Sequence, residues 1–285
     1  MRTIPIHAAP DSAELANEQA DFEAPRMPQA EPLETPFPPA GASAADRAAS
    51  ASVLERFLAA MRGHRFGADA TPHARLGELH ASARAVLDES LGQGEVSAIV
   101  RGAGGAPDWL VQETAFAGVW RVRRARGAAA EDLLEAGDMP HAIRAAAERQ
   151  PPAARLDAAR LPEGVMNAPA LVNEIRYHAR RCVAGRPAHV VNLSLLPLNA
   201  ADRDGLEALL GEGPISILSR GFGNCRVTSS AVRGVWRVQY FNSMSTLILD
   251  TIEVVDLPEA ACATAEDYAD SIERLDELLA WLREA

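Results

Sequence analysis

The chain has 285 residues and 48% of them are hydrophobic, which is enough to form a buried core in one large domain or two small ones. Its formal net charge of −11 argues against nucleic acid or an anionic membrane surface as a partner, because both would repel it. Its cysteines, Cys182, Cys225 and Cys262, are too widely spaced for a disulfide framework, so we expect a reducing, cytoplasmic setting.

The first segment, residues 1–42, is predicted to be a disordered arm. From Pro10 to Ala42 it is rich in Pro, Ala, Glu and Asp, and its few large apolar residues show no period. No apolar stretch follows Met1, and no run of about 18 apolar residues occurs anywhere. We therefore expect neither a secretory signal nor a membrane span.

Ordered structure is expected from about Ser43. Apolar residues recur there at helical spacing from Val53 to Met61, and Gly63 is placed to end that helix.

The rest of the chain contains an internal repeat. Residues 91–97, Leu-Gly-Gln-Gly-Glu-Val-Ser, return as residues 210–216, Leu-Gly-Glu-Gly-Pro-Ile-Ser. The string Gly-Val-Trp-Arg-Val occurs unchanged at 118–122 and 234–238. Two copies of one unit are predicted, at 43–150 and 186–285, separated by a linker and helix at 151–185.

The second copy shows the order of elements in the unit. Alternation predicts a strand at 190–195, Asn199 is placed to cap a helix that Gly211 ends, and three further strands are expected at 215–219, 226–238 and 246–255. In the first copy the helix is expected at 76–91, without an equivalent of the first strand. The prediction is an α+β fold with two tandem β-α-β-β-β-like repeats, mainly antiparallel or mixed sheets, and helices on one face.

Two more helices are expected outside these units. Asn167 and Pro169 open one whose apolar side runs to Cys182 and Val183, with Gly185 at its end. Thr264 caps a C-terminal helix whose apolar face has four-three spacing. The solvated face of that helix is acidic, with Asp267, Asp270, Glu273, Asp276 and Glu277.

No catalytic or metal-binding constellation is evident in the sequence, and we expect no cofactor and no enzymatic activity. His178 and Cys182 are four residues apart, but two ligands are too few for a closed zinc site, and we assign Cys182 to the core. Trp120 and Trp236 alternate with arginine and are also assigned to the core. The basic run at 121–126 is interpreted as a solvated strand end.

One glycine-rich segment is the candidate partner-binding site: Arg220, Gly221, Phe222, Gly223, Asn224, Cys225 and Arg226. Strands rather than a helix follow it, so a phosphate loop is disfavoured and a hairpin is favoured. As an alternative, Arg220 and Arg226 bind carboxylates or carbonyls while Phe222 is an exposed anchor. A third reading makes Cys225 a reactive thiol with a depressed pKa.

The stretch from Met166 to Leu282 resembles the C-terminal region of the HupH/HyaF/HoxQ family of hydrogenase expression and formation proteins. The resemblance is carried by linked strings at 188–197, 217–226, 240–243 and 256–260, followed by the acidic helix. The first copy resembles the more variable N-terminal half of that family.

This resemblance implies an accessory chaperone that binds the iron–sulfur-carrying small-subunit precursor of a [NiFe] hydrogenase, with its twin-arginine signal peptide, before export. It also implies a thioredoxin-like accessory protein as a companion. We expect acidic groups including Asp270 and Glu273 to steer the basic signal peptide, and a strand edge near 221–226 to pair with backbone. The competing hypothesis is a thiol or iron–sulfur carrier that uses Cys225, with Cys182 or Cys262.

Overall fold

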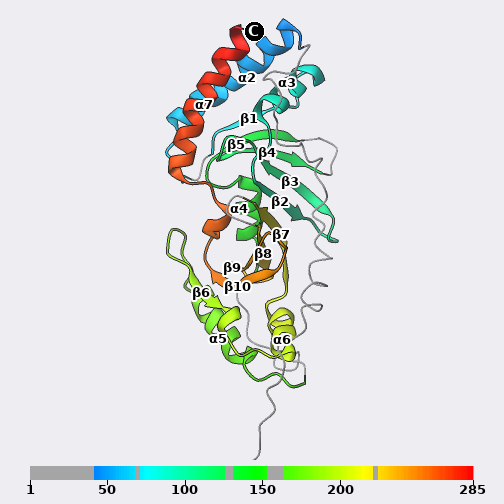
Figure 1. Cartoon of the computed structure of the whole chain (residues 1–285), viewed down its shortest axis with the longest axis vertical. Helices are drawn as coiled ribbons and strands as arrows, with labels where there is room; N and C mark the ends of the chain where they lie inside the picture. The colour runs from blue at the N-terminus through cyan, green and yellow to red at the C-terminus, as the bar shows by residue number, and fades with distance from the viewer. Residues whose placement is uncertain (1–41, 69–70, 126–130, 153–162, 221–223, 285) are drawn as a thin grey trace, which may run out of the picture.

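The computed structural model describes residues 42–68, 71–125, 131–152, 163–220 and 224–284. Its centre is one antiparallel sheet of ten strands in the order β1-β5-β4-β3-β2-β7-β8-β9-β10-β6 (Figure 1). The α+β prediction is therefore confirmed. Nearly all of the predicted arm, residues 1–41, lies outside the described residues.

The first copy supplies one half of the sheet. After helix α2 (Ala44–Gly63) come β1 (His73–Arg75), α3 (Ala81–Leu91), β2 (Val96–Arg101), β3 (Pro107–Glu113), β4 (Val119–Arg124), β5 (Asp132–Ala136) and α4 (His141–Glu148). As expected, Ser43 caps α2 by accepting a hydrogen bond from the backbone N–H of Asp46.

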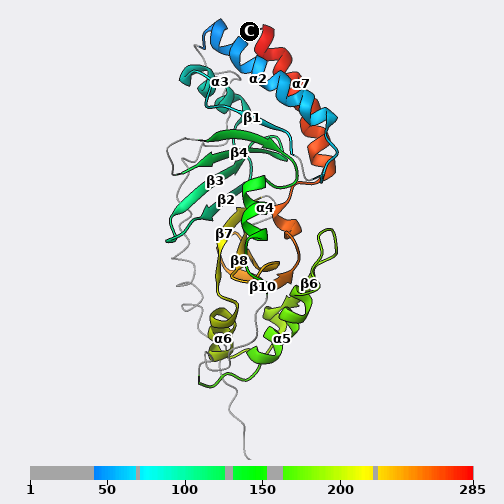
Figure 2. The same cartoon turned by 180° about the vertical axis from the view of Figure 1, so that it is seen from behind.

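The second copy supplies the other half. Its elements are α5 (Ala168–Ala179), β6 (His189–Asn192), the 3₁₀ turn η2 (Leu193–Leu195), α6 (Ala200–Leu210), β7 (Glu212–Ser219), β8 (Asn224–Ser230), β9 (Val235–Phe241), β10 (Leu247–Val254), η3 (Glu259–Ala261) and α7 (Ala265–Glu284). Helix α7 then returns to pack against α2 at the far end of the molecule, away from α5 and α6 (Figures 1 and 2).

The two copies join through β2 and β7, which pair antiparallel. Ala98 and Ile217, the residues that directly follow the repeated strings 91–97 and 210–216, are direct partners in this ladder. Equivalent residues therefore face each other across the junction, so the two halves are related by a pseudo-twofold axis through this pair.

Helices cover both faces of the sheet, rather than the one face that we expected. Trp120 and Trp236 share a central core with α4 and the segment around η3. Val119 belongs to a core with α2, α3 and α7, and Val235 belongs to a core with α5 and α6. Since neighbouring residues on a strand point to opposite faces, the two end cores lie on the face opposite the central core.

Several predicted boundaries in the first copy and at the first helix of the second were wrong. The first copy does contain the missing strand: β1 pairs with β5 as β6 pairs with β10. The first-copy helix begins at Ala81, not at Leu76, because β1 and a turn precede it. Helix α5 ends at Ala179, so Cys182 and Val183 lie in the following turn.

The segment 226–238, expected as one strand, is two strands, β8 and β9, joined by a turn at 231–234. Gly234 takes a φ of +70° in this turn, a conformation that favours glycine. Each unit is therefore β-α-β-β-β-β. The strand edge expected near 221–226 was also wrong, because β7 and β8 are both interior strands and the edges of the sheet are β1 and β6.

Candidate functional site

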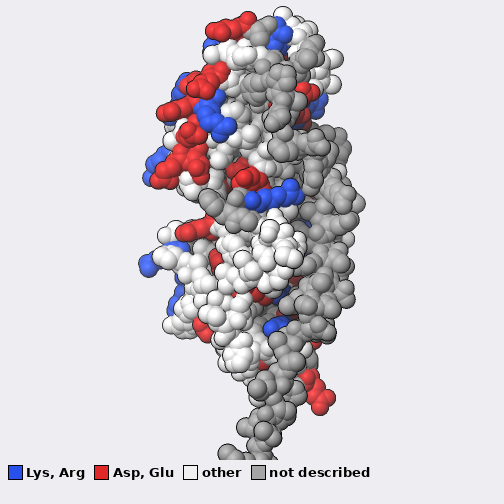
Figure 3. Space-filling view, in the orientation of Figure 1, with Lys and Arg blue, Asp and Glu red and all other residues white. Residues whose placement is uncertain are grey.

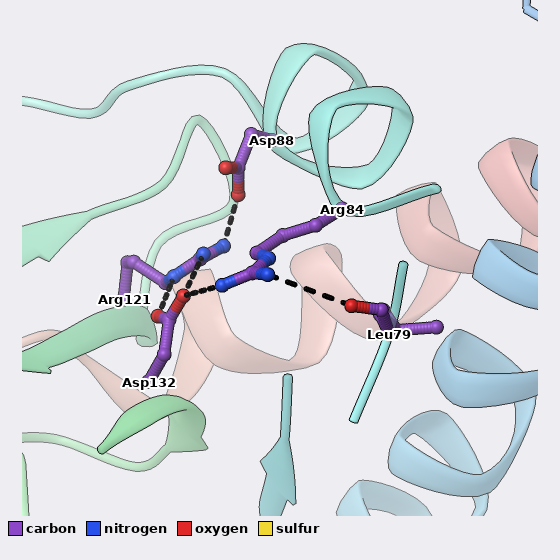
Figure 4. A network of polar contacts seen from close by, with 5 residues as sticks. All are labelled: Leu79, Arg84, Asp88, Arg121 and Asp132. Carbon is purple, nitrogen blue, oxygen red and sulfur yellow. Dashed lines mark hydrogen bonds and ion pairs between the residues drawn. The ribbon is translucent and has the colours of Figure 1, made fainter. Parts of the chain in front are cut away.

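The first copy holds a network of arginines and carboxylates on the face opposite the central core (Figure 4). Arg121 on β4 donates from Nη2 to Asp132 on β5 at 2.6 Å and also pairs with Asp88 on α3. Arg84 on α3 reaches the same Asp132 carboxylate at 3.4 Å. Arg121 is only 9% exposed, so the expected solvated strand end was wrong at this residue. Because Arg121 on β4 pairs with Asp88 on α3, it fixes α3 against the sheet.

Burial changes the ionisation of this network. Desolvation raises the pKa of Asp88, although the neighbouring Arg121 acts in the opposite direction.

The second copy repeats the network at equivalent positions. Arg237 on β9 donates from Nε and Nη2 to the Asp250 carboxylate at 3.0 and 2.9 Å, and from Nη1 to Glu207 on α6 at 2.8 Å. Arg203, one turn earlier on α6, corresponds to Arg84. Neither network was predicted from the sequence, although the repeated arginines and the matching carboxylates are visible in both copies.

A cavity of about 460 Å³ lies beside the second network, between α6 and strands β8, β9 and β10. Apolar side chains including Leu206, Leu210 and Ile252 line one part, and Arg203, Thr228 and Gln239 line another. The cavity can therefore accept a ligand with both apolar and polar groups.

The candidate segment 220–226 lies at the connection between β7 and β8. Gly221, Phe222 and Gly223 fall outside the described residues, so the predicted Phe222 anchor lies there as well. Arg220 and Asn224 are exposed, and the Arg220 backbone N–H donates to the Glu95 carbonyl oxygen at 3.2 Å. Arg226 lines the cavity, opposite Gln239 in the β8–β9 ladder.

Cys225 is a core residue of β8, 4% exposed, beside Tyr240 on β9. Burial raises the pKa of its thiol to about 11, although the hydrogen bond with Tyr240 opposes this shift. The reading of Cys225 as a thiol with a depressed pKa was therefore wrong, because the side chain points into the central core rather than toward the arginines beside it in sequence.

The acidic helix lies where the sequence indicated. Asp270 and Glu273 are exposed on α7, and acidic side chains gather along this helix (Figure 3). Ser271 and Arg274 donate to the carbonyl oxygens of Ala117 and Ala115, so α7 is fixed to the first copy. In the described part of the chain, no polar contact joins Asp270 or Glu273 to the 220–226 segment.

His178 stacks on His189 rather than sharing a ligand set with Cys182, with ring centroids 3.5 Å apart. Among the described residues, no group of three or more His, Cys, Asp or Glu side chains is arranged to hold a metal ion. None of the described helices is both long and apolar enough to cross a bilayer.

Comparison with known proteins defines the class. Residues 75–160 and 165–282 each match the family described as HupH hydrogenase expression protein, C-terminal conserved region, and these segments contain the two halves of the sheet except for the first two residues of β1. The tandem repeat is therefore also a repeat of the family's conserved region.

Similar relatives carry corresponding names. The chain is 46% identical over 211 residues to hydrogenase expression/formation protein HoxQ of Cupriavidus necator, covering 74% of each chain. It is 44% identical to HupH of Rhodobacter capsulatus over 73% of each chain. It is 39% identical to HupQ of Azotobacter chroococcum over 94% of this chain and 90% of that protein. The chain belongs to the HupH/HyaF/HoxQ family of hydrogenase expression and formation proteins.

Proposed function

We propose that this protein is a non-catalytic chaperone in [NiFe] hydrogenase maturation, and that its client is the precursor of the iron–sulfur-carrying small subunit. The observation that carries this proposal is the match of both halves of the sheet to a family whose relatives are named for hydrogenase expression and formation. The client would be bound in the cytoplasm with its twin-arginine signal peptide attached, and a thioredoxin-like accessory protein would be the companion.

The acidic surface of α7 supports this choice of client. A twin-arginine signal peptide is basic, and the exposed Asp270 and Glu273 would attract it. Attraction between surface charges mainly accelerates encounter, whereas retention of a client needs buried contact.

Exposed apolar side chains provide surface for such contact. In the described part of the chain, the exposed large apolar side chains all lie between residues 166 and 248: Met166, Tyr177, Val183, Val190, Leu195, Met244 and Ile248. An incompletely assembled client exposes apolar surface that such residues can cover.

The thiol-carrier hypothesis has weaker physical support. Burial raises the pKa of Cys225 to about 11 and that of Cys262 to about 12, and it also raises the pKa of Cys182. Thiolates are the forms that bind metal and attack disulfides, so all three shifts work against a carrier role.

The test is binding of purified components. The small-subunit precursor, with its signal peptide, is titrated against this protein under anaerobic conditions, and the signal-less mature form serves as control. We expect a stoichiometric complex with the precursor and weaker binding of the mature form. Failure to bind the precursor, together with stoichiometric iron and sulfide on the isolated chaperone, would favour the carrier.

A further inference from the structure

The cavity beside α6 has a counterpart position in the first copy, and the two positions differ in a few side chains. In the first copy Gln112 donates from its amide to the carbonyl oxygens of Gly94 and Val96 at 3.1 and 3.2 Å. The equivalent residue of the second copy is Thr228, which is shorter and lines the cavity. The exchange replaces a long side chain that bonds to backbone carbonyls by a shorter one that lines the cavity.

The equivalent arginines of α3 and α6 also differ: the one in the first copy is paired, and the one in the second copy faces the cavity. Arg84 on α3 pairs with Asp132, whereas its counterpart Arg203 lines the cavity and is exposed. In the described part of the chain, the Arg203 guanidinium has no carboxylate within ion-pair distance. Among the described residues, the carboxylate of Asp250, the counterpart of Asp132, is paired only with Arg237. The second copy therefore presents an available cation beside its network.

Gln239 points to the chemistry of a ligand. It is 5% exposed and lines the cavity, yet its side-chain amide has no hydrogen-bond partner among the described residues. Its amide is not among the fully buried unpaired groups of the described chain, so it is open to the cavity, where water or a ligand can bond to it. A primary amide can donate to and accept from one peptide group, which makes a polypeptide backbone a matching partner.

The cavity has the length and the side chains to bind an extended peptide. Its lining follows β8 from Arg226 to Ser230, a length of about 13 Å for a strand, which suits a few residues of extended chain. Leu206, Leu210 and Ile252 offer apolar contacts, and Arg203 offers a partner for a carboxylate.

We propose that this cavity binds an extended segment of the client that carries an acidic side chain beside an apolar one. The inference rests on the proposed chaperone function and names a second recognition element for the same client. The acidic α7 surface would attract basic residues of the client, and the cavity would hold an acidic and apolar segment. The divergence of the two copies thus leaves the first as a closed structural unit and the second as a binding unit.

The experiment measures the affinity of the purified small-subunit precursor for the full-length chain and for four variants. Arg203→Ala removes the cation, Arg203→Glu reverses it, and Thr228→Gln restores the residue of the first copy. Arg84→Ala is the matched control on α3. We expect binding to weaken about tenfold for Arg203→Ala, further for Arg203→Glu, and about tenfold for Thr228→Gln. Arg84→Ala should bind as the wild type does.

The outcomes separate this inference from the proposed function. If the wild-type chain does not bind the precursor, the chaperone function itself is contradicted. If the wild type binds and the Arg203 and Thr228 variants bind equally well, the function stands and the cavity inference is overturned. An equal loss in Arg84→Ala would also overturn it, since the effect would not belong to the cavity. Arg203 is exposed on α6, so its variants report on binding even if Thr228→Gln impairs folding.

Discussion

The repeated pentapeptide Gly-Val-Trp-Arg-Val shows how each side chain has a separate role at the residue scale. Gly118 and Gly234 take φ values of +76° and +70°, which favour glycine. The following valines enter the end cores, and the tryptophans enter the central core. Trp120 donates from Nε1 to the Gly137 carbonyl oxygen at 2.9 Å. Each of the five positions therefore has a structural constraint: the glycine forms a turn, the two valines and the tryptophan pack in cores, and the arginine forms ion pairs.

These roles were only partly predictable from sequence. Burial of Trp120 follows from strand alternation and was expected. The network of Arg121 was missed, because its partners Asp88 and Asp132 lie on a helix and another strand and no local pattern reports that contact. Burial of Cys225 was missed because its neighbours Arg220 and Arg226 suggested a polar turn.

We predict that Arg121→Ala costs about 3 kcal/mol of unfolding free energy, because it leaves the buried Asp132 without its main partner. Arg237→Ala should cost less, since the Arg237 side chain is 23% exposed against 11% for Arg121. Urea unfolding of both variants measures the difference. A loss at Arg237 as large as that at Arg121 would contradict the ranking.

A second prediction concerns Cys225. Its thiol pKa of about 11 should make alkylation by iodoacetamide at pH 8 about 100-fold slower in the folded protein than in the denatured chain, because each pKa unit costs tenfold in thiolate. Peptide mass mapping over time gives the rate. Equal rates in folded and denatured protein would show an accessible, ionised thiol.

At the scale of elements, one carboxylate joins two helices. Asp202 is fully buried near the start of α6 and accepts hydrogen bonds from the backbone N–H groups of Met166, Asn167 and Ala168 at 2.8, 2.6 and 3.0 Å. It also closes a capping box with Asn199. Burial alone would raise its pKa, but these hydrogen bonds outweigh burial and lower the pKa to about 2. The α5–α6 pair is thereby fixed beside the cavity.

The stabilisation from Asp202 should depend on pH. Because its folded pKa lies below the ordinary value of about 4, its contribution is present above pH 4 and is lost as the pH falls toward 2. Asp202→Ala should lower the unfolding free energy at pH 7 by about 2 kcal/mol and reduce the dependence on pH between 4 and 2. Denaturant unfolding across that range tests this. If the unfolding free energy of the variant falls between pH 4 and 2 as much as that of the wild type, groups other than Asp202 cause the loss.

The order of helices and strands was largely predictable, because the repeated strings in the sequence are enough to define two copies of one unit. The exceptions have local causes. The strand β1 has three residues, His73 to Arg75, and is too short to show alternation. The β8–β9 turn at 231–234 was missed although Ser230 and Gly234 are turn-forming residues, because no proline and no Asn-Gly pair marks it. The joining of both copies into one sheet through β2 and β7 depends on long-range pairing that no window of sequence contains.

At the scale of the whole molecule, the acidic helix α7 and the exposed apolar side chains lie in different regions. On the face that Figure 3 shows, acidic side chains lie along α7, which packs against α2 at one end of the molecule (Figures 1 and 3), whereas the exposed large apolar residues of the described chain lie between Met166 and Ile248. A client that extends across the sheet can contact both regions. The pseudo-twofold fold thus carries an asymmetric surface.

This distribution predicts that association is sensitive to salt. Raising the ionic strength from about 0.05 M to about 0.5 M screens surface charges more strongly and should slow precursor association about tenfold or more. The double variant Asp270→Asn with Glu273→Gln should associate more slowly at low salt and depend less on salt. Stopped-flow kinetics measures both rates. Unchanged kinetics would remove electrostatic steering from the mechanism and leave the apolar contacts.

We propose that this chain holds a hydrogenase small-subunit precursor. The most direct measurement is affinity isolation of the tagged protein from a hydrogenase-producing cell, followed by intact-mass analysis of the co-purifying small subunit. The account predicts a small subunit that retains its twin-arginine signal peptide. Recovery of only the processed subunit, or of no small subunit while the tagged protein carries bound iron, would contradict it.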